Sequence, residues 1–93
     1  MRFYRISATS VGNEFDSFCP TFAKAREAAV NMARYDPRWV WSDVRIDLGD
    51  VEPNLPLLVR LLNNQRLSRD EFVPIRTWTL TRRFGTKEVT PGD

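Results

Sequence analysis

Alternating apolar and polar residues mark the strands of this chain, because successive side chains of a strand point to opposite faces. Residues 2–9 alternate in this way, and residues 15–19 follow a turn signal at Gly12, so the two segments predict a hairpin. Residues 39–48 alternate as well, and residues 75–84 predict a closing strand. The apolar side chains expected to face the core are Tyr4, Ile6, Val44, Ile46, Leu48, Trp78 and Leu80.

Two other segments carry apolar residues at helical spacing. Residues 21–35 predict an amphipathic helix that begins at Thr21 and ends before Pro37, because the residue before a proline is pushed out of the helical region. Residues 55–65 predict a second helix with Asn54 as its N-cap. A helix this short and apolar is marginal in water, so we expect the sheet, another element or a partner to cover it. Its expected apolar stripe comprises Leu55, Leu58, Val59 and Leu62, extended by Leu57 and Leu61.

These elements predict one α+β domain over residues 1–89. The expected architecture is a two-layer sandwich in which a three- to four-stranded, mostly antiparallel sheet carries both helices on one face. The 93 residues suffice for one core, since a domain of this size buries roughly 60% of the surface of its unfolded chain. Residues 66–74 predict a polar loop, residues 85–93 a frayed end, and residues 90–93 a flexible tail.

The composition argues against most catalytic chemistry. The chain has no histidine, which removes Ser-His-Asp and Cys-His catalysis as well as imidazole ligation of metals. Its single cysteine, Cys19, lacks a histidine partner to activate the thiol and is interpreted as structural. On an extended strand Asp43 and Asp47 would lie about 13 Å apart, too far for a catalytic carboxylate pair. We therefore expect neither an enzyme nor a cofactor or metal site.

The hydropathy pattern predicts a cytoplasmic protein without membrane contact. No apolar run approaches the ~18 residues needed to span a bilayer, and the N-terminus MRFYRISATS alternates instead of forming a signal-peptide core. Fourteen basic and twelve acidic residues give a net charge of +2, without the cationic excess of proteins that coat DNA. Many of the basic residues lie in the last third, which makes a local basic patch a candidate surface there.

Trp39 and Trp41 are the first candidate binding residues. In the alternation of residues 39–48 they share the parity of the acidic residues, the face expected to point outward, whereas Val40 points with the core residues. Indole rings on a solvent face are typical anchors of binding surfaces. The alternative is that they roof a sheet edge or pack beneath the loop at 35–38. The candidate partner-binding residues are Tyr35, Arg38, Trp39, Trp41 and Arg45.

The stretch RTWTLTRRFG, residues 76–85, supports two interpretations. Its threonines form a polar face that suits β-structure, and Trp78 and Leu80 suit the core, so a closing strand explains the alternation without a ligand. Alternatively, aromatic and basic side chains on one exposed face would stack bases and bind phosphates. The candidate nucleic-acid-binding residues are Arg76, Trp78, Arg82, Arg83, Phe84 and Lys87.

The segments DVRIDLGDVEPNLPLLVRLLN and TWTLTRRFGTKEV resemble the small accessory proteins of phages and prophages, among them anti-CRISPR proteins. The resemblance covers about the last half of the chain. It implies a non-catalytic protein of the bacterial host cytoplasm that blocks a host defence protein or nucleoprotein complex by stoichiometric occupation of a surface. A nucleic-acid-binding accessory protein is the alternative function, and a homodimer through the leucine-rich helix Leu55 to Leu62 is a further partner hypothesis.

Overall fold

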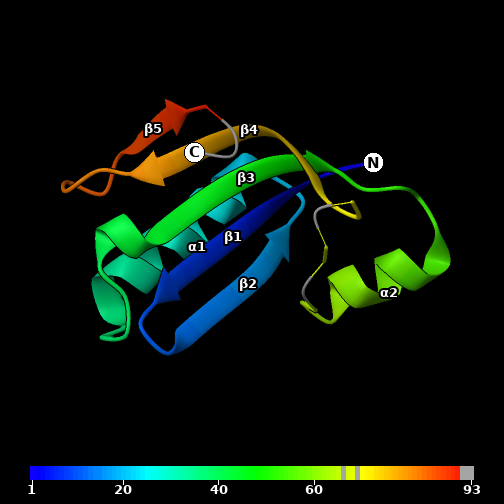
Figure 1. The fold of residues 1–93 in the computed structure, drawn as a ribbon. Helices are drawn as coiled ribbons and strands as arrows, with labels where there is room; N and C mark the ends of the chain where they lie inside the picture. The colour runs from blue at the N-terminus through cyan, green and yellow to red at the C-terminus, as the bar shows by residue number, and fades with distance from the viewer. Residues whose placement is uncertain (66, 69, 91–93) are drawn as a thin grey trace.

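The computed structural model describes residues 1–65, 67–68 and 70–90. Within them the chain forms a five-stranded sheet of order β2-β1-β3-β4-β5, in which every neighbouring pair is antiparallel (Figure 1). The α+β class is therefore confirmed, and the expected count of three to four strands is too low. The strands are β1 (Arg2–Ser10), β2 (Asn13–Cys19), β3 (Val44–Asp50), β4 (Val73–Leu80) and β5 (Thr86–Val89); the helices are α1 (Phe22–Tyr35), η1 (Trp41–Asp43) and α2 (Leu55–Leu62).

β1 and β2 form the predicted hairpin. Gly12 has a φ of 79°, a left-handed conformation that glycine adopts without steric cost, and Ser10 pairs with Asn13 across the turn. Ile6 and Ala8 are buried, as the alternation predicts.

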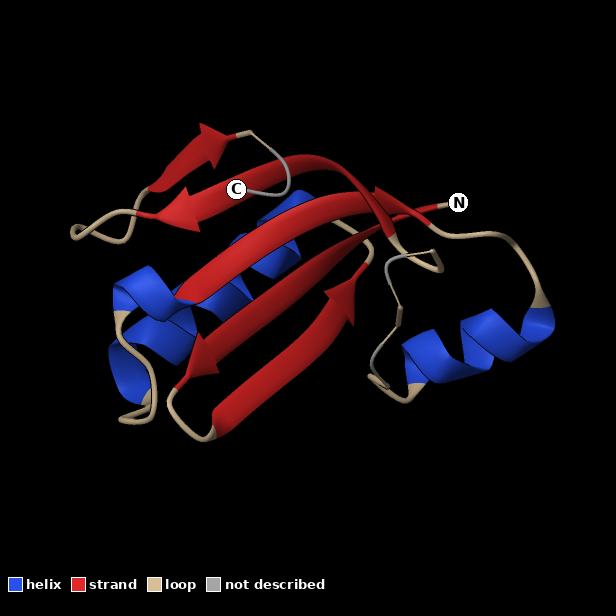
Figure 2. Cartoon of the chain, viewed as in Figure 1, coloured by secondary structure: helices blue, strands red, loops and turns tan. Residues whose placement is uncertain are grey.

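Helix α1 covers one face of the sheet (Figure 2). The helix begins at Phe22, one residue later than expected, and Thr21 is its N-cap: the Thr21 side-chain oxygen accepts a hydrogen bond from the Lys24 backbone N–H at 3.3 Å. Ala25 and Ala29 are fully buried, and such small side chains allow the helix to approach the strands closely. This first core cluster contains Ile6, Ala8, Ala25, Ala29, Trp39, Val44, Ile46, Leu48, Trp78 and Leu80.

A second core cluster lies on the opposite face, so the expectation of both helices on one face is wrong. The cluster contains Val51, Leu57, Leu61, Leu67 and Phe72, with Phe3 and Phe18 packed against it. Phe3 neighbours Tyr4 in β1 and therefore points away from α1. Helix α2 lies beyond one end of the sheet (Figure 1) and covers that end of the second face.

The apolar stripe of α2 is also assigned incorrectly by sequence spacing. Leu57 and Leu61 are buried, whereas Leu55 and Leu62 of the expected stripe are 74% and 83% exposed. The helix is apolar almost all round, so its periodicity does not indicate which side meets the sheet. Asn54 does cap the helix as predicted, since its side-chain oxygen accepts the Leu57 backbone N–H at 3.0 Å.

The segment expected as a polar loop supplies the centre of the second cluster. Phe72 has no exposed surface; its ring lies 5.9 Å from the Phe18 ring and 4.5 Å from the guanidinium carbon of Arg5. A β-carbon on Gly49 would come under 3.0 Å from three carbons of this ring. The aromatic ring therefore packs directly on the bare backbone of β3.

Asp47, expected on an outer charged face, is buried with 1% exposure. It stands opposite Arg5 on β1 and Thr77 on β4, and both donate to its carboxylate, at 2.8 Å and 2.6 Å respectively. A buried carboxylate needs such partners because it has left water. The polar side of β3 is thus the middle of a network that joins three strands.

Residues 39–43 do not extend β3, which begins at Val44. The Val40 backbone N–H donates to the Asp43 carboxylate at 3.0 Å, and this local bond competes with an extended chain. The resulting turn reverses the expected faces, since Trp39 is 3% exposed and Val40 is 56% exposed. The predicted strand over 39–48 is wrong in its first half.

The predicted closing strand also ends early. β4 stops at Leu80, the chain reverses over residues 81–85, and β5 pairs with β4 where a frayed end is expected. The alternation continues through this turn and so does not reveal the reversal. Residues 91–93 lie outside the described part of the chain, and the flexible tail over 90–93 stays a prediction.

We expect Gly49→Ala to lower the free energy of unfolding by about 1–3 kcal/mol, the usual cost of overpacking a core. Gly49 lacks a positive φ, so the backbone itself accommodates alanine and the cost arises from the Phe72 ring. Denaturant unfolding measures the effect. In a Phe72→Leu background, which lacks the clashing ring carbons, the same substitution should cost much less; equal costs in the two backgrounds would contradict the contact.

Candidate anion-binding pocket

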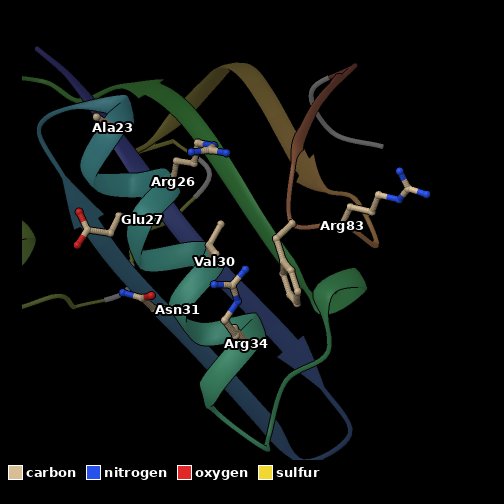
Figure 3. A pocket seen from close by; sticks show the side chains of 8 residues that line it. Ala23, Arg26, Glu27, Val30, Asn31, Arg34 and Arg83 are labelled. Carbon is tan, nitrogen blue, oxygen red and sulfur yellow. The ribbon is translucent and has the colours of Figure 1, made fainter.

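A pocket of about 480 Å³ lies between the exposed side of α1 and the turn that joins β4 to β5 (Figure 3). It brings together two segments that are far apart in the sequence. Its lining residues are Ala23, Arg26, Glu27, Val30, Asn31, Arg34, Arg83 and Phe84.

Three arginines dominate the charge of this pocket. Arg26 and Arg34 are eight residues apart on α1, or about 12 Å along the helix axis, with Val30 between them. Arg83 joins them from the turn, and its side chain extends outward in Figure 3. In the described part of the chain none of the three forms an ion pair, and Glu27 is the one carboxylate in the lining. Three guanidinium groups against one carboxylate leave the pocket with an excess of positive charge.

The turn holds Phe84 against this cluster. The Phe84 backbone N–H donates to the Thr81 carbonyl at 2.9 Å, and the Thr81 N–H donates to the Gly85 carbonyl at the same distance. Phe84 has a φ of 61°, a left-handed conformation that costs a residue with a β-carbon roughly 1–2 kcal/mol. Its half-buried ring lies 4.9 Å from the guanidinium carbon of Arg34.

The structure separates the residues proposed from the stretch RTWTLTRRFG. Trp78 is 9% exposed and lies beneath α1, with its ring 4.8 Å from that of Phe22, so it does not stand on a face that could stack bases. Arg76 lies over Trp78 and forms an ion pair with Glu88. Lys87 stands opposite Thr79, on the sheet face turned away from α1.

Arg83 and Phe84 are the two residues of that set that enter the pocket, and Arg82 is exposed beside them. Sequence reasoning missed Arg26 and Arg34. Both belong to the polar side of a correctly predicted helix, but nothing in the sequence places that side next to the turn at 81–85.

The proposed partner-binding surface does not form as one patch. Trp39 is buried in the first core cluster and Trp41 packs against that cluster, in agreement with the alternative that they pack inward. Arg38 lies over Trp39, with its guanidinium carbon 5.6 Å from the ring. Tyr35 is 71% exposed, whereas Arg45 points to the other face of the sheet, 3.5 Å from the Asp47 carboxylate.

A larger groove of about 800 Å³ crosses the sheet face turned away from α1. Its basic and acidic side chains lie close to one another: Arg5 binds Asp47 at 2.8 Å, and Arg60 pairs with Glu71. The Ser68 backbone N–H and Arg60 lower the pKa of the Glu71 carboxyl, in that order of effect. Because these charges are already paired with one another, they attract a charged ligand only weakly. The groove is therefore a weaker candidate binding site than the pocket on α1.

Cys19 and Asp43, the other residues considered for catalysis, contact parts of the fold. Cys19 packs against the first core cluster, and burial raises the pKa of its thiol, an effect that the nearby Lys24 partly opposes. Asp43 caps the turn at Val40. Within residues 1–65, 67–68 and 70–90, no cluster of acidic and cysteine side chains could hold a metal ion. None of the helices described is long and apolar enough to cross a bilayer.

Comparison of the chain with protein-family models, curated proteins and solved structures gives no match.

We expect the Asp36 carboxyl to titrate with a pKa of about 2, and Arg38→Ala to return it toward 3.8. The Arg38 side chain donates to this carboxylate at 2.7 Å and its backbone N–H at 3.0 Å, and both bonds favour the charged form. The pair therefore stabilises the fold above the unfolded pKa near 4, and this contribution is lost as the pH falls toward 2. Carboxyl NMR titration checks the prediction; an unchanged midpoint in the variant would contradict it.

Proposed function

We propose that the protein is a small, non-catalytic nucleic-acid-binding accessory protein that holds phosphate groups in the pocket between α1 and the β4–β5 turn. The observation that carries this proposal is the cluster of Arg26, Arg34 and Arg83, which lack carboxylate partners in the described chain. Guanidinium groups suit this role because their planar donors match phosphate oxygens.

The electrostatics of the whole chain support a local site. A net charge of +2 is too small to attract a polyanion over the whole surface, so binding would depend on where the free basic groups gather. Arg2 and Arg76 are engaged with acidic side chains, and Arg5 with a buried one. Arg26, Arg34 and Arg83 have no carboxylate partner among the described residues, and all three line one pocket.

We expect the double variant Arg26→Ala/Arg83→Ala to bind single-stranded and duplex oligonucleotides at least tenfold more weakly in 100 mM salt. Each lost phosphate contact should also reduce the slope of log affinity against log salt by about one, so the slope should fall by about two. Fluorescence anisotropy over a range of salt concentrations measures both quantities.

The matched control is Arg2→Ala/Lys87→Ala, which removes the same charge from the end of β1 and from the opposite sheet face. This control should retain the affinity and slope of the wild type. Equal losses in the two double variants would mean that net charge alone governs binding, and absence of binding by the wild type would refute the proposed function.

A second candidate function is self-association through the leucine-rich helix α2. The observation that favours it is the outer face of α2, where Leu55, Val59 and Leu62 are exposed. This stripe has no charged side chain, so two copies could meet through it across a twofold axis without repulsion. We therefore propose a second copy of the chain as its occupant.

Sedimentation velocity tests the α2 face. We expect a dimer for the wild type and a folded monomer for Leu55→Glu/Leu62→Glu, because both side chains are exposed in the protomer and are not needed for its core. Val11→Glu, at a fully exposed apolar residue on the β1–β2 turn, is the control and should leave the dimer intact. A monomeric wild type at high concentration would refute self-association.

A further inference from the structure

Phe84 has a backbone conformation that aromatic residues rarely adopt. Among the described residues, the non-glycine positions with positive φ are Asn64, at 52°, and Phe84, at 61°. Asparagine tolerates this region, but a bulky side chain there is a genuine outlier. Strained residues of this kind cluster at functional sites, where the surrounding structure holds them in place.

The turn gives Phe84 this conformation although Gly85 follows directly. Glycine would adopt a positive φ without cost, yet no positive φ is found at Gly85. The Gly85 backbone N–H instead donates to the Thr81 hydroxyl at 3.0 Å, which closes the turn behind Phe84. The strain therefore falls on the residue whose side chain lines the pocket.

The ring of Phe84 and the guanidinium of Arg34 form an aromatic and cationic pair at the pocket wall. They lie 4.9 Å apart, and the ring is half-buried, so part of it stays open to a ligand. Arg26 lies about 12 Å from Arg34 toward the start of α1, and Arg83 precedes Phe84 in the turn with its side chain directed outward (Figure 3), so a strand that passes the pair could meet both basic groups.

We propose that this pocket binds a single-stranded segment of nucleic acid, with one unpaired base stacked on Phe84 and Arg34 and the flanking phosphates bound by Arg26 and Arg83. This inference rests on the proposed function and specifies its substrate class. A duplex presents base edges in its grooves and hides the base faces, so a ring can stack on a base only in a single strand. Stacking of this kind tolerates any base, since each has a π-face.

The pocket volume agrees with a ligand the size of one nucleotide. Its volume of about 480 Å³ lies within the range of small-molecule sites, and the pocket is open to solvent, so a strand can continue beyond it. An acidic peptide without aromatic residues would satisfy the arginines but would offer no aromatic ring to stack on that of Phe84.

Four probes distinguish base stacking from phosphate binding: a single-stranded 12-mer, a 12-base-pair duplex, an abasic 12-mer and an acidic peptide with the charge of the single strand. We expect the wild type to bind the single strand at least tenfold more tightly than the other three. Fluorescence anisotropy at 50 and 200 mM salt gives each affinity and its salt slope.

Phe84→Asn removes the ring but suits a positive φ, so the turn should keep its shape and thermal unfolding should confirm a folded protein. Alanine substitution of stacking aromatics costs about 5- to 150-fold per base, and we expect a loss in this range for the single strand. Affinity for the abasic probe and the salt slope should stay unchanged, because no phosphate contact is lost. Phe84→Tyr retains a stacking ring and should bind like the wild type.

The outcomes distinguish the inference from the function on which it rests. Equal affinity for the single strand, duplex and abasic probes, with no effect of Phe84→Asn, would overturn base stacking and leave phosphate binding intact. Binding of the acidic peptide as tightly as the single strand would overturn nucleic acid as the ligand. No binding to any nucleic-acid probe would refute both.

Discussion

The packing of Phe72 on Gly49 is the constraint on which the second half of the structure depends. An antiparallel sheet with a helix on one face leaves its other face to water unless some segment covers it. Here the outer carbons of the Phe72 ring lie against the backbone of β3, and a side chain at position 49 would collide with them. Because the ring is held there, the segment before β4 and helix α2 are drawn over one end of the sheet, where Leu57 and Leu61 find an apolar surface.

The polar centre of that face follows from the same packing. The Arg5 guanidinium lies against the Phe72 ring and binds the Asp47 carboxylate, which also accepts a bond from Thr77. Removal of water strengthens these bonds and makes each of them necessary, since an unpaired buried charge is costly. Side-chain bonds on the polar face thereby join β1, β3 and β4, which are also joined by backbone hydrogen bonds. Arg5 and Asp47 on this face thus stabilise the fold.

In the pocket on α1, by contrast, the charged side chains do not stabilise the described part of the fold through ion pairs. Arg26, Arg34 and Arg83 contribute no ion pair to the described fold, and Phe84 is held at a positive φ that costs stability. Helix α1 needs neither feature to cover the sheet, because its buried side consists of small apolar residues. The unpaired cations and the strained aromatic residue at this rim are therefore features that the fold itself does not require.

Local signals in the sequence were enough to identify the β1–β2 hairpin with its glycine turn, both helices, the Asn54 cap of α2 and the α+β class. They did not determine which faces these elements bury. A period of two or of 3.6 residues groups side chains by direction, but the side that is covered depends on what packs there. For this reason Trp39 is buried and Val40 is exposed, the reverse of the expected faces. Leu55 and Leu62, expected in the covered stripe of α2, lie on its exposed face. Strand β5 forms where a frayed end is expected. Of the candidate site, Arg83 and Phe84 were predicted from the sequence. Arg26 and Arg34 belong to it only because the tertiary structure places α1 beside the β4–β5 turn.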